Sequence, residues 1–248
     1  MYWGTDMVPI FSIFLGRNMP LKEKIIEKVE NEAGEWPYLQ ELPQELHTMK
    51  FQRLYQENDD MYELFSYNNE ERHLGICAYF HQETEEYKVR VWIGLTEFCL
   101  MEFITASFEV FEQHLRHYLE GAIHDLVVYN PDNMSYVTKE MEITAWDYTN
   151  ILPETLEGFQ LFIKPSAPVR VLNGSYIVFD YTDFAIESNF IIYYNEFRCE
   201  FFGEARIRNI PEMNYIFDSP DIPHLVEKLH QHLIPRLQEI RQRAENED

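Results

Sequence analysis

The sequence predicts an α+β fold made of two diverged repeats, each an antiparallel β-meander followed by an amphipathic helix. Three observations support this prediction: short aromatic-rich segments with alternating side chains, a helical segment after each set of them, and the recurrence of this order. The two copies cover residues 61–121 and 175–235. Because an amphipathic helix has to bury its apolar stripe, we expect the helices to pack on one face of the sheets.

The strands are predicted from a two-residue period. In residues 87–94, apolar side chains alternate with Lys88 and Arg90, which places the two sets on opposite faces of a strand. β-branched and aromatic residues dominate these segments, as a half-buried pleated surface favours. The expected strands are residues 62–67, 74–81 and 87–94 in the first copy, and 176–181, 188–195 and 197–204 in the second.

The helix of each copy is predicted from apolar side chains at intervals of three and four residues. The first helix follows Ser107 and is expected to end near Gly121. In the second copy, Asp221 suits the N-cap position and Pro223 the first turn. Pro235 lies late in this helix, where the loss of a backbone donor should kink the helix or split off its end.

Further elements are expected outside the two copies. The apolar residues 8–15 are too few to span a bilayer, which takes about 20 residues, so we expect them to form a strand. Residues 20–33 have the pattern of an amphipathic helix. Asn173 and Gly174 form a hairpin signal. We also expect strands at residues 51–56 and 136–143.

The repeat divides the chain into four parts. A similar signature precedes each copy, LPQEL at residues 42–46 and LPETL at residues 152–156. We therefore expect an N-terminal extension and helix in residues 1–41, the first β-meander and helix in residues 42–123, a connector in residues 124–151, and the second β-meander and helix in residues 152–248.

The chain is strongly acidic, and the charge is spread evenly. The formal net charge is −23, with −12 in residues 1–124 and −11 in residues 125–248. Such a surface repels nucleic acids and anionic membranes, which are bound through lysine and arginine. It favours a basic protein partner and a fast, salt-sensitive encounter with it. Solubility alone would also account for the charge.

The cysteines indicate the redox environment of the protein. Cys77, Cys99 and Cys199 are an odd number without paired spacing. Cys77 and Cys199 fall in expected strands, where a small apolar side chain packs. The pattern favours a reducing, cytoplasmic location.

Sequence motifs for catalysis or cofactor binding are missing. The sequence has no G-x-S-x-G elbow, no P-loop, no G-x-G-x-x-G before a helix, no paired C-x-x-C and no H-E-x-x-H. His114 and His117 have the spacing of two metal ligands on one helix face, but a metal site needs a third ligand. We therefore interpret them as helix-surface residues and predict no catalytic residue, no cofactor and no metal.

One tripeptide has the E-x-K form of metal-dependent nucleases. Glu86, Tyr87 and Lys88 open an expected strand, and Asp59 or Asp60 could supply the upstream acid. The second copy has the sequence EFR at residues 196–198 instead, and the negative charge of the chain repels nucleic acid. We therefore interpret the tripeptide as the solvated end of a hairpin.

The leading hypothesis is a non-catalytic, acidic protein-binding module for a basic partner, with a bacterial immunity protein or toxin inhibitor as its most concrete form. The alternative is a hydrolase that uses carboxylates in a cleft between the two repeats. A third hypothesis is a structural homodimer. For the leading hypothesis, the predicted contact residues are Asp59, Asp60, Glu83, Glu85 and Glu86, which would also fit an ordinary solvated turn.

Overall fold

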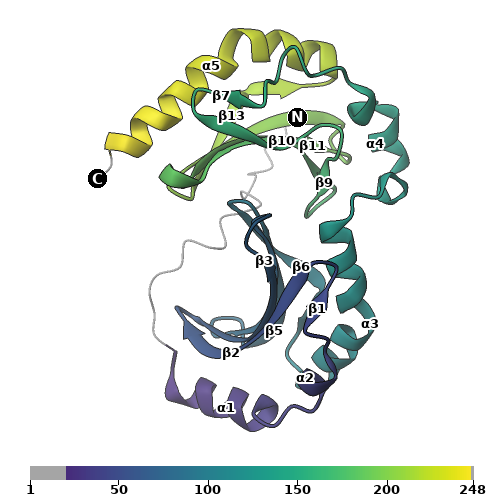
Figure 1. The fold of residues 1–248 in the computed structure, drawn as a ribbon, viewed down its shortest axis with the longest axis vertical. Helices are drawn as coiled ribbons and strands as arrows, with labels where there is room; N and C mark the ends of the chain where they lie inside the picture. Colours follow the sequence, from purple (N-terminus) through teal and green to yellow (C-terminus); the bar gives the residue numbers. More distant parts are fainter. Residues whose placement is uncertain (1–20, 247–248) are drawn as a thin grey trace, which may run out of the picture. The chain divides into compact units, whose positions relative to one another are not determined.

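The computed structural model describes residues 21–246 and confirms an α+β fold with two antiparallel sheets. The chain divides into two compact units with the boundary between Val128 and Tyr129 (Figure 1). Unit 1 contains a six-stranded sheet, named sheet A here, and unit 2 contains a seven-stranded sheet, named sheet B. The apolar residues 8–15, predicted to form a strand, lie outside the described residues.

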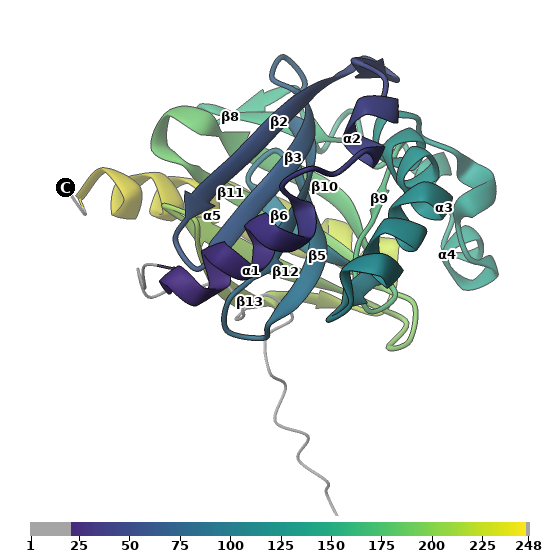
Figure 2. The ribbon, with the colours of Figure 1, turned by 90° about the horizontal axis from the view of Figure 1, so that it is seen from below.

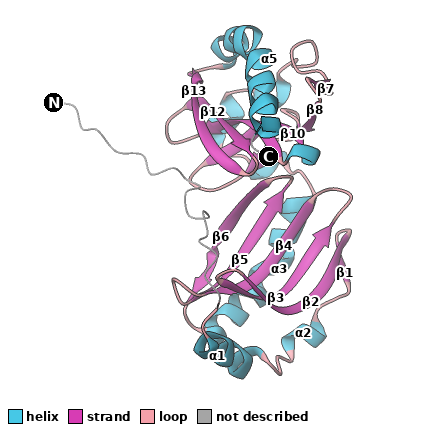
Figure 3. Ribbon diagram, turned by 90° about the vertical axis from the view of Figure 1, so that its left-hand side faces the viewer, coloured by secondary structure: helices cyan, strands magenta, loops and turns pink. Residues whose placement is uncertain are grey.

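Unit 1 is a continuous meander. Its strands follow one another across sheet A in chain order, from β1 to β6, and every neighbouring pair is antiparallel (Figure 3). Its elements are α1 (Glu23–Ala33), α2 (Tyr38–Glu41), β1 (Glu45–Leu46), β2 (Met49–Asn58), β3 (Met61–Asn69), β4 (Leu74–His81), β5 (Glu86–Ile93), β6 (Thr96–Thr105) and α3 (Phe108–Val127).

The core of unit 1 gathers around Tyr87 of β5. The Tyr87 ring stacks on Phe111 of α3 with 5.2 Å between ring centroids, and the Tyr87 hydroxyl donates a 2.5 Å hydrogen bond to Glu32 of α1. Helix α1 also contacts β3 (Figure 2). Tyr87, Phe111 and Leu115 are buried. The alternation of residues 87–94 therefore places Tyr87 on the side of the sheet that both helices contact.

Helix α3 is longer than the sequence predicts. Ser107 caps it, because its hydroxyl accepts a 3.3 Å hydrogen bond from the backbone nitrogen of Val110. The helix does not end near Gly121 but continues to Val127. Ile123 is fully buried, so the apolar stripe that stabilises the helix extends beyond the glycine.

Sheet B of unit 2 has the order β13-β12-β11-β10-β8-β7, and β9 pairs with β10. The hairpin predicted at Asn173 and Gly174 is confirmed, since both residues have positive φ values and the turn joins β9 to β10. The elements are η2 (Pro131–Asn133), α4 (Tyr136–Glu140), η3 (Ile143–Ala145), β7 (Thr155–Leu156), β8 (Phe159–Ile163), β9 (Val169–Arg170), β10 (Ser175–Asp183), η4 (Phe184–Ile186), β11 (Ser188–Asn195), β12 (Glu200–Ile207), β13 (Ile210–Ser219) and α5 (Ile222–Asn246).

Helix α5 begins as predicted but is not split at Pro235. The Asp221 side chain accepts a 2.9 Å hydrogen bond from the backbone nitrogen of His224, which confirms the N-cap. The helix remains continuous across Pro235. Leu233 and Leu237 on either side are buried in the core of unit 2, and this packing offsets the missing backbone donor. Across residues 21–246, neither α5 nor any shorter helix combines the length and apolar character that crossing a bilayer requires.

Several sequence predictions of local structure are wrong. The strand predicted at residues 136–143 is instead the short helix α4, which Ser135 caps by accepting a 3.2 Å hydrogen bond from the backbone nitrogen of Thr138. The strand predicted at residues 197–204 begins only at Glu200, because Phe197 lies exposed in the turn. Strands β6 and β13 were not predicted at all, although each closes one edge of its sheet.

The two-residue strands β1 and β7 are held in the same way. In unit 1, the buried Tyr67 of β3 donates a 2.7 Å hydrogen bond from its hydroxyl to the carbonyl of Pro43. In unit 2, the buried Tyr181 of β10 donates an equal 2.7 Å bond to the carbonyl of Pro153. Each proline lies in one of the two LPxxL signatures, two residues before the short strand.

The outer edge of β2 is interrupted by a bulge. The register of β2 against β3 shifts between Arg53 and Gln56, and Tyr55 within this shift has a φ of 51°. The Tyr55 hydroxyl donates a hydrogen bond to the carbonyl of Ala33. Strand β1 pairs only with Met49 and Lys50, so within residues 21–246 the rest of β2 has no strand on its outer side.

Candidate functional site

The structure brings the five predicted contact residues to one end of sheet A. Asp59 and Asp60 form the turn between β2 and β3, while Glu83 and Glu85 lie in the turn between β4 and β5, and Glu86 begins β5. The two turns are joined by a 2.8 Å hydrogen bond from the backbone nitrogen of Gln82 to the carbonyl of Asp60. We refer to Asp59, Asp60, Glu83, Glu85 and Glu86 as the acidic end.

The residues of the acidic end differ in exposure. Asp59, Glu83 and Glu85 are exposed, whereas Asp60 and Glu86 are partly buried. Within residues 21–246, the carboxylates of the three exposed residues form no ion pair with a lysine, an arginine or a histidine. Their charges are therefore not neutralised by neighbouring side chains.

A buried histidine lies beside the acidic end. The Nε2 atom of His81 is 3.0 Å from Oδ2 of Asp60, and its Nδ1 atom is 3.0 Å from the hydroxyl of Thr84. His81 is 6% exposed. One ligand atom each of Asp60, His81 and Glu83 lie within 4.8 Å of one another, the one such group of metal-ligating side chains in residues 21–246.

A lysine adds positive charge to this cluster. The Lys88 ammonium is 3.2 Å from the Glu86 carboxylate. Burial alone would raise the pKa of the Glu86 carboxyl, but hydrogen bonds from Thr84 and Lys88 outweigh this effect and lower the pKa. Burial lowers the pKa of the His81 imidazole, and Lys88 adds to this effect against the opposing attraction of Asp60. These two effects favour a neutral imidazole on His81 and an ionised carboxylate on Glu86.

His81 is not among the site residues that the sequence predicts, although one sequence signal points to it. His81 is the last residue of a segment predicted to be a strand, directly before the acidic turn. In an antiparallel meander, that position lies next to the preceding turn, and the register indeed pairs His81 with Met61, which follows Asp60. The histidines that were considered, His114 and His117, instead contact the ring of Tyr118.

A buried ion-pair network lies further along the same strands. Arg90 of β5 pairs with the buried Glu63 of β3, and its guanidinium also lies 3.1 Å from Glu97 of β6. Glu63 accepts further hydrogen bonds of 2.7 Å from Gln56 and 2.8 Å from Asn58. The donors to Glu63 lie on β2 and β5, and Glu63 itself lies on β3. This network is therefore suited to holding these strands of sheet A together.

Unit 2 has a second buried polar cluster on sheet B. Burial raises the pKa of Asp180 to about 7, against the opposing effects of Thr182 and Asn189. Asn189 donates at 3.2 Å to one carboxylate oxygen of Asp180. Burial also raises the pKa of Glu204, although the Arg206 guanidinium lies 2.9 Å away. A carboxyl group with a pKa near 7 gains or loses its proton within the physiological pH range.

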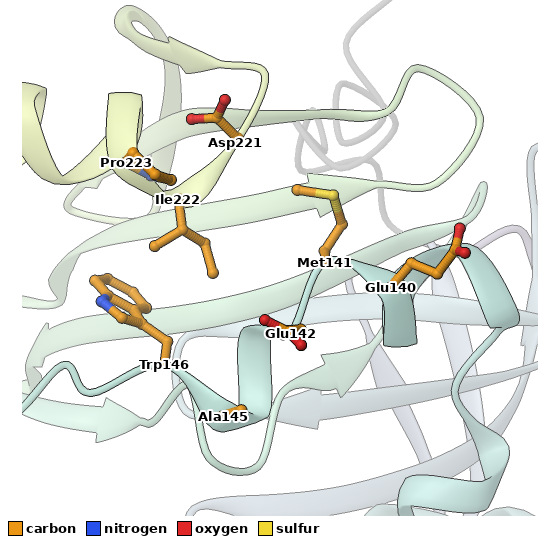
Figure 4. A pocket seen from close by; sticks show the side chains of 8 residues that line it. All are labelled: Glu140, Met141, Glu142, Ala145, Trp146, Asp221, Ile222 and Pro223. Carbon is orange, nitrogen blue, oxygen red and sulfur yellow. The ribbon is translucent and has the colours of Figure 1, made fainter.

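A hollow of about 420 Å³ opens on unit 2 between η3 and the start of α5 (Figure 4). Met141, Trp146 and Ile222 line it, and all three pack against the core of the unit. Asp221 at its rim already accepts the capping bond from His224, whose Nδ1 atom lies 2.6 Å from the Asp221 carboxylate. The lining side chains thus serve core packing and helix capping.

Comparisons of this chain with protein-family models, with curated proteins and with solved structures found no match. A function therefore has to be inferred from the side chains of this chain alone. The acidic end and its histidine combine exposed charge, a defined geometry and metal-ligating atoms, which makes this part of sheet A the first candidate.

Proposed function

We propose that this chain is a non-catalytic protein-binding module that binds a basic protein through the acidic end, as an immunity protein or toxin inhibitor would. The observation that carries the proposal is the convergence of five carboxylates from two turns, three of them exposed and without a cationic partner in residues 21–246. Unpaired surface carboxylates attract a positively charged surface and speed its encounter with the protein.

The overall charge supports the same partner. With a net charge of −23 spread over the chain, long-range repulsion acts against nucleic acids and anionic membranes. The field of the whole protein would steer a basic protein toward the surface, and the acidic end would supply the local contacts. Because exposed charges are screened by salt, the complex should weaken as ionic strength rises.

Affinity capture from the native cell lysate at low and high salt, followed by mass spectrometry, tests this proposal. We expect a basic protein to be captured at low salt and released at high salt. The double variant Asp59→Asn with Glu85→Gln should capture less of it, because both residues are exposed and lie in the two turns. Capture of only acidic partners, or of none at either salt, would contradict the proposal.

A matched control lies at the opposite end of sheet A. Glu70 and Glu71 are exposed acids in the turn between β3 and β4. The variant Glu70→Gln with Glu71→Gln changes the net charge by the same amount as the test variant. Equal loss of capture in both variants would show that total charge, rather than the acidic end, drives the interaction.

We infer that residues 42–123 and 152–248 arose by duplication of a meander followed by a helix on one face of the sheet. The equal bonds from Tyr67 to Pro43 and from Tyr181 to Pro153 support this inference, since both prolines lie in matching signatures. An experimental structure in which Tyr67 and Tyr181 occupied different positions in their sheets would contradict it.

We also propose a cytoplasmic location and keep a homodimer as a further hypothesis. The three cysteines are free, which agrees with a reducing compartment. Exposed apolar side chains on β13, Ile210, Tyr215 and Ile216, offer a surface on which a second copy could pack. Light scattering over a range of protein concentrations would reveal the dimer, and a constant monomer mass would remove the hypothesis.

A hydrolase is the second candidate, favoured by one observation. A general acid needs a proton near neutral pH, and the raised pKa of Asp180 meets that requirement. Asp180 is fully buried, however, so a substrate would have to gain access to it. Turnover in a substrate screen that is lost in an Asp180→Asn variant would favour this candidate over the binding module.

A further inference from the structure

The side chains of Asp60, His81 and Glu83 present one imidazole nitrogen and two carboxylates to a common point. Their ligand atoms lie within 4.8 Å of one another, and Nε2 of His81 is 3.0 Å from Oδ2 of Asp60. We propose that these three residues bind a divalent transition-metal ion of the Zn²⁺ type. Ligands around a tetrahedral Zn²⁺ are about 3.4 Å apart, so only a small movement of Glu83 is required.

The imidazole is held in the orientation that a metal ligand needs. A hydrogen bond between Nδ1 of His81 and the Thr84 hydroxyl, 3.0 Å long, fixes the ring. Nδ1 also accepts a 3.4 Å hydrogen bond from the backbone nitrogen of Thr84, which places the ring proton on Nε2, 3.0 Å from Oδ2 of Asp60. A bound metal ion would take the place of this proton. Metal-ligating histidines commonly use their second nitrogen for an orienting hydrogen bond of this kind.

The backbone fixes two of the three ligands and leaves the third adjustable. Asp60 and His81 are held by the 2.8 Å bond between the two turns and by the pairing of Met61 with His81. Glu83 is exposed in the turn and can change its side-chain rotamer at little cost. The site therefore combines two preset ligands with one that can close on the ion.

The charge around the site favours a cation. Lys88 lies nearby, but its ammonium pairs with Glu86 at 3.2 Å. The carboxylates of Asp59 and Glu85 in the same two turns add negative charge. An imidazole among the ligands favours Zn²⁺ over Mg²⁺ or Ca²⁺, which prefer oxygen ligands. Three protein ligands leave a fourth position for water or for a side chain of a partner.

Zinc binding by the purified full-length chain, without any partner, tests the proposal independently of the proposed function. In isothermal titration calorimetry with ZnCl₂, the tightest binding event should have a stoichiometry of one zinc ion per chain. The exposed Glu83→Gln variant should bind this equivalent about tenfold more weakly or worse, because it loses a charged ligand. The Asp60→Asn variant should do the same, and MgCl₂ should not compete.

The control is a histidine with similar chemistry but no third ligand. Nδ1 of His224 lies 2.6 Å from the carboxylate of Asp221, and the His224→Ala variant should keep the strongest zinc site. Because His81 is buried, its role is better read by NMR of ¹⁵N-labelled histidine than by substitution. Zinc should shift the Nε2 resonance of His81 first. Unchanged zinc affinity in Glu83→Gln and Asp60→Asn, or a His81 resonance unaffected by bound zinc, would overturn the proposal.

Discussion

The hydroxyl of Tyr67 donates a 2.7 Å hydrogen bond to the carbonyl of Pro43, and this bond attaches the segment before β1 to the centre of sheet A. The Tyr67 ring is fully buried whereas Pro43 is exposed, so the bond joins the interior of the sheet to a surface segment. Tyr181 and Pro153 have the same relationship in sheet B. In each unit, one phenol thus fixes the chain at its entry into the sheet.

Removal of either hydroxyl should destabilise the protein. The Tyr67→Phe and Tyr181→Phe variants should each lower the free energy of unfolding by about 0.5–1.5 kcal/mol, because each loses one hydrogen bond. Urea denaturation followed by circular dichroism measures the change. Tyr118→Phe is the control, since Tyr118 is 45% exposed and should change stability by less than about 0.5 kcal/mol. Equal changes in the free energy of unfolding in all three variants would show that these two hydrogen bonds do not stabilise the protein.

The ion pair between Glu63 and Arg90 should matter more than the pair between Arg90 and Glu97. Glu63 is 4% exposed and accepts bonds from three side chains, whereas the Glu97 side chain is 34% exposed. We expect Glu63→Gln to lower the free energy of unfolding by about 2–3 kcal/mol and Glu97→Gln by less than about 1 kcal/mol. The comparison uses the same guanidinium in both cases. A larger loss in Glu97→Gln would contradict the assignment of Glu63 as the main partner.

Gly121 should be replaceable with a gain in stability. It lies in the middle of α3, and a methyl group added there would meet no atom within 4 Å. Gly121→Ala should therefore raise the free energy of unfolding by about 1 kcal/mol, as measured by thermal or urea denaturation. Gly75→Ala is the opposite case, because its methyl group would lie 1.7 Å from the ring of Trp92 and should lower stability. Destabilisation by Gly121→Ala would mean that α3 does not continue through this position.

Asp180 should make the stability of the protein depend on pH. Its pKa is raised by burial to about 7, above the value of about 4 in an unfolded chain. The folded state therefore holds the proton more tightly, so the stabilisation is complete below about pH 4 and is lost as the pH rises through about 7. Glu204 and Arg206 on β12 and Tyr193 on β11 are the charged and titratable groups that act on it.

The Asp180→Asn variant isolates this effect. Asparagine stays neutral at every pH. The free energy of unfolding of the variant minus that of the parent protein should therefore be larger at pH 8 than at pH 5, as measured by urea denaturation at both values. The exposed Asp132 provides the control, and Asp132→Asn should show no such gain. A constant difference between Asp180→Asn and the parent protein across this pH range would contradict the raised pKa.

The sequence predicted the inner strands of both sheets, which are rich in aromatic and β-branched residues and are buried along almost their whole length. Strand β5 alternates cleanly because Tyr87 and Val89 face the helices, while Lys88 and Arg90 face the other side. Strands β6 and β13 were missed because they close the sheets at one edge, where Met101 and Tyr215 are exposed and the alternation is interrupted by shifts in register. Burial favours the apolar and aromatic residues from which strands are predicted, and the exposed positions of β6 and β13 weaken that signal.

The position of the acidic end could be predicted, but its chemistry could not. A meander places alternate turns at the same end of the sheet, which brings Asp60 and Glu83 together. The end of a predicted strand places His81 beside these turns, but its ring orientation depends on Thr84 and on the register between β3 and β4. The contacts of the His81 ring therefore arise from tertiary pairing, which sequence patterns do not specify.

The bulge at Tyr55 has a consequence for how this chain meets other chains. An unpaired strand edge invites addition of a foreign strand, which is the first step of amyloid-like aggregation. With Tyr55 at a φ of 51° and its hydroxyl bonded to Ala33, the amides and carbonyls of β2 that no strand of residues 21–246 covers do not form a regular row. A second strand could therefore pair with only a few residues of β2 at a time, which protects an aromatic-rich sheet from polymerising along its edge.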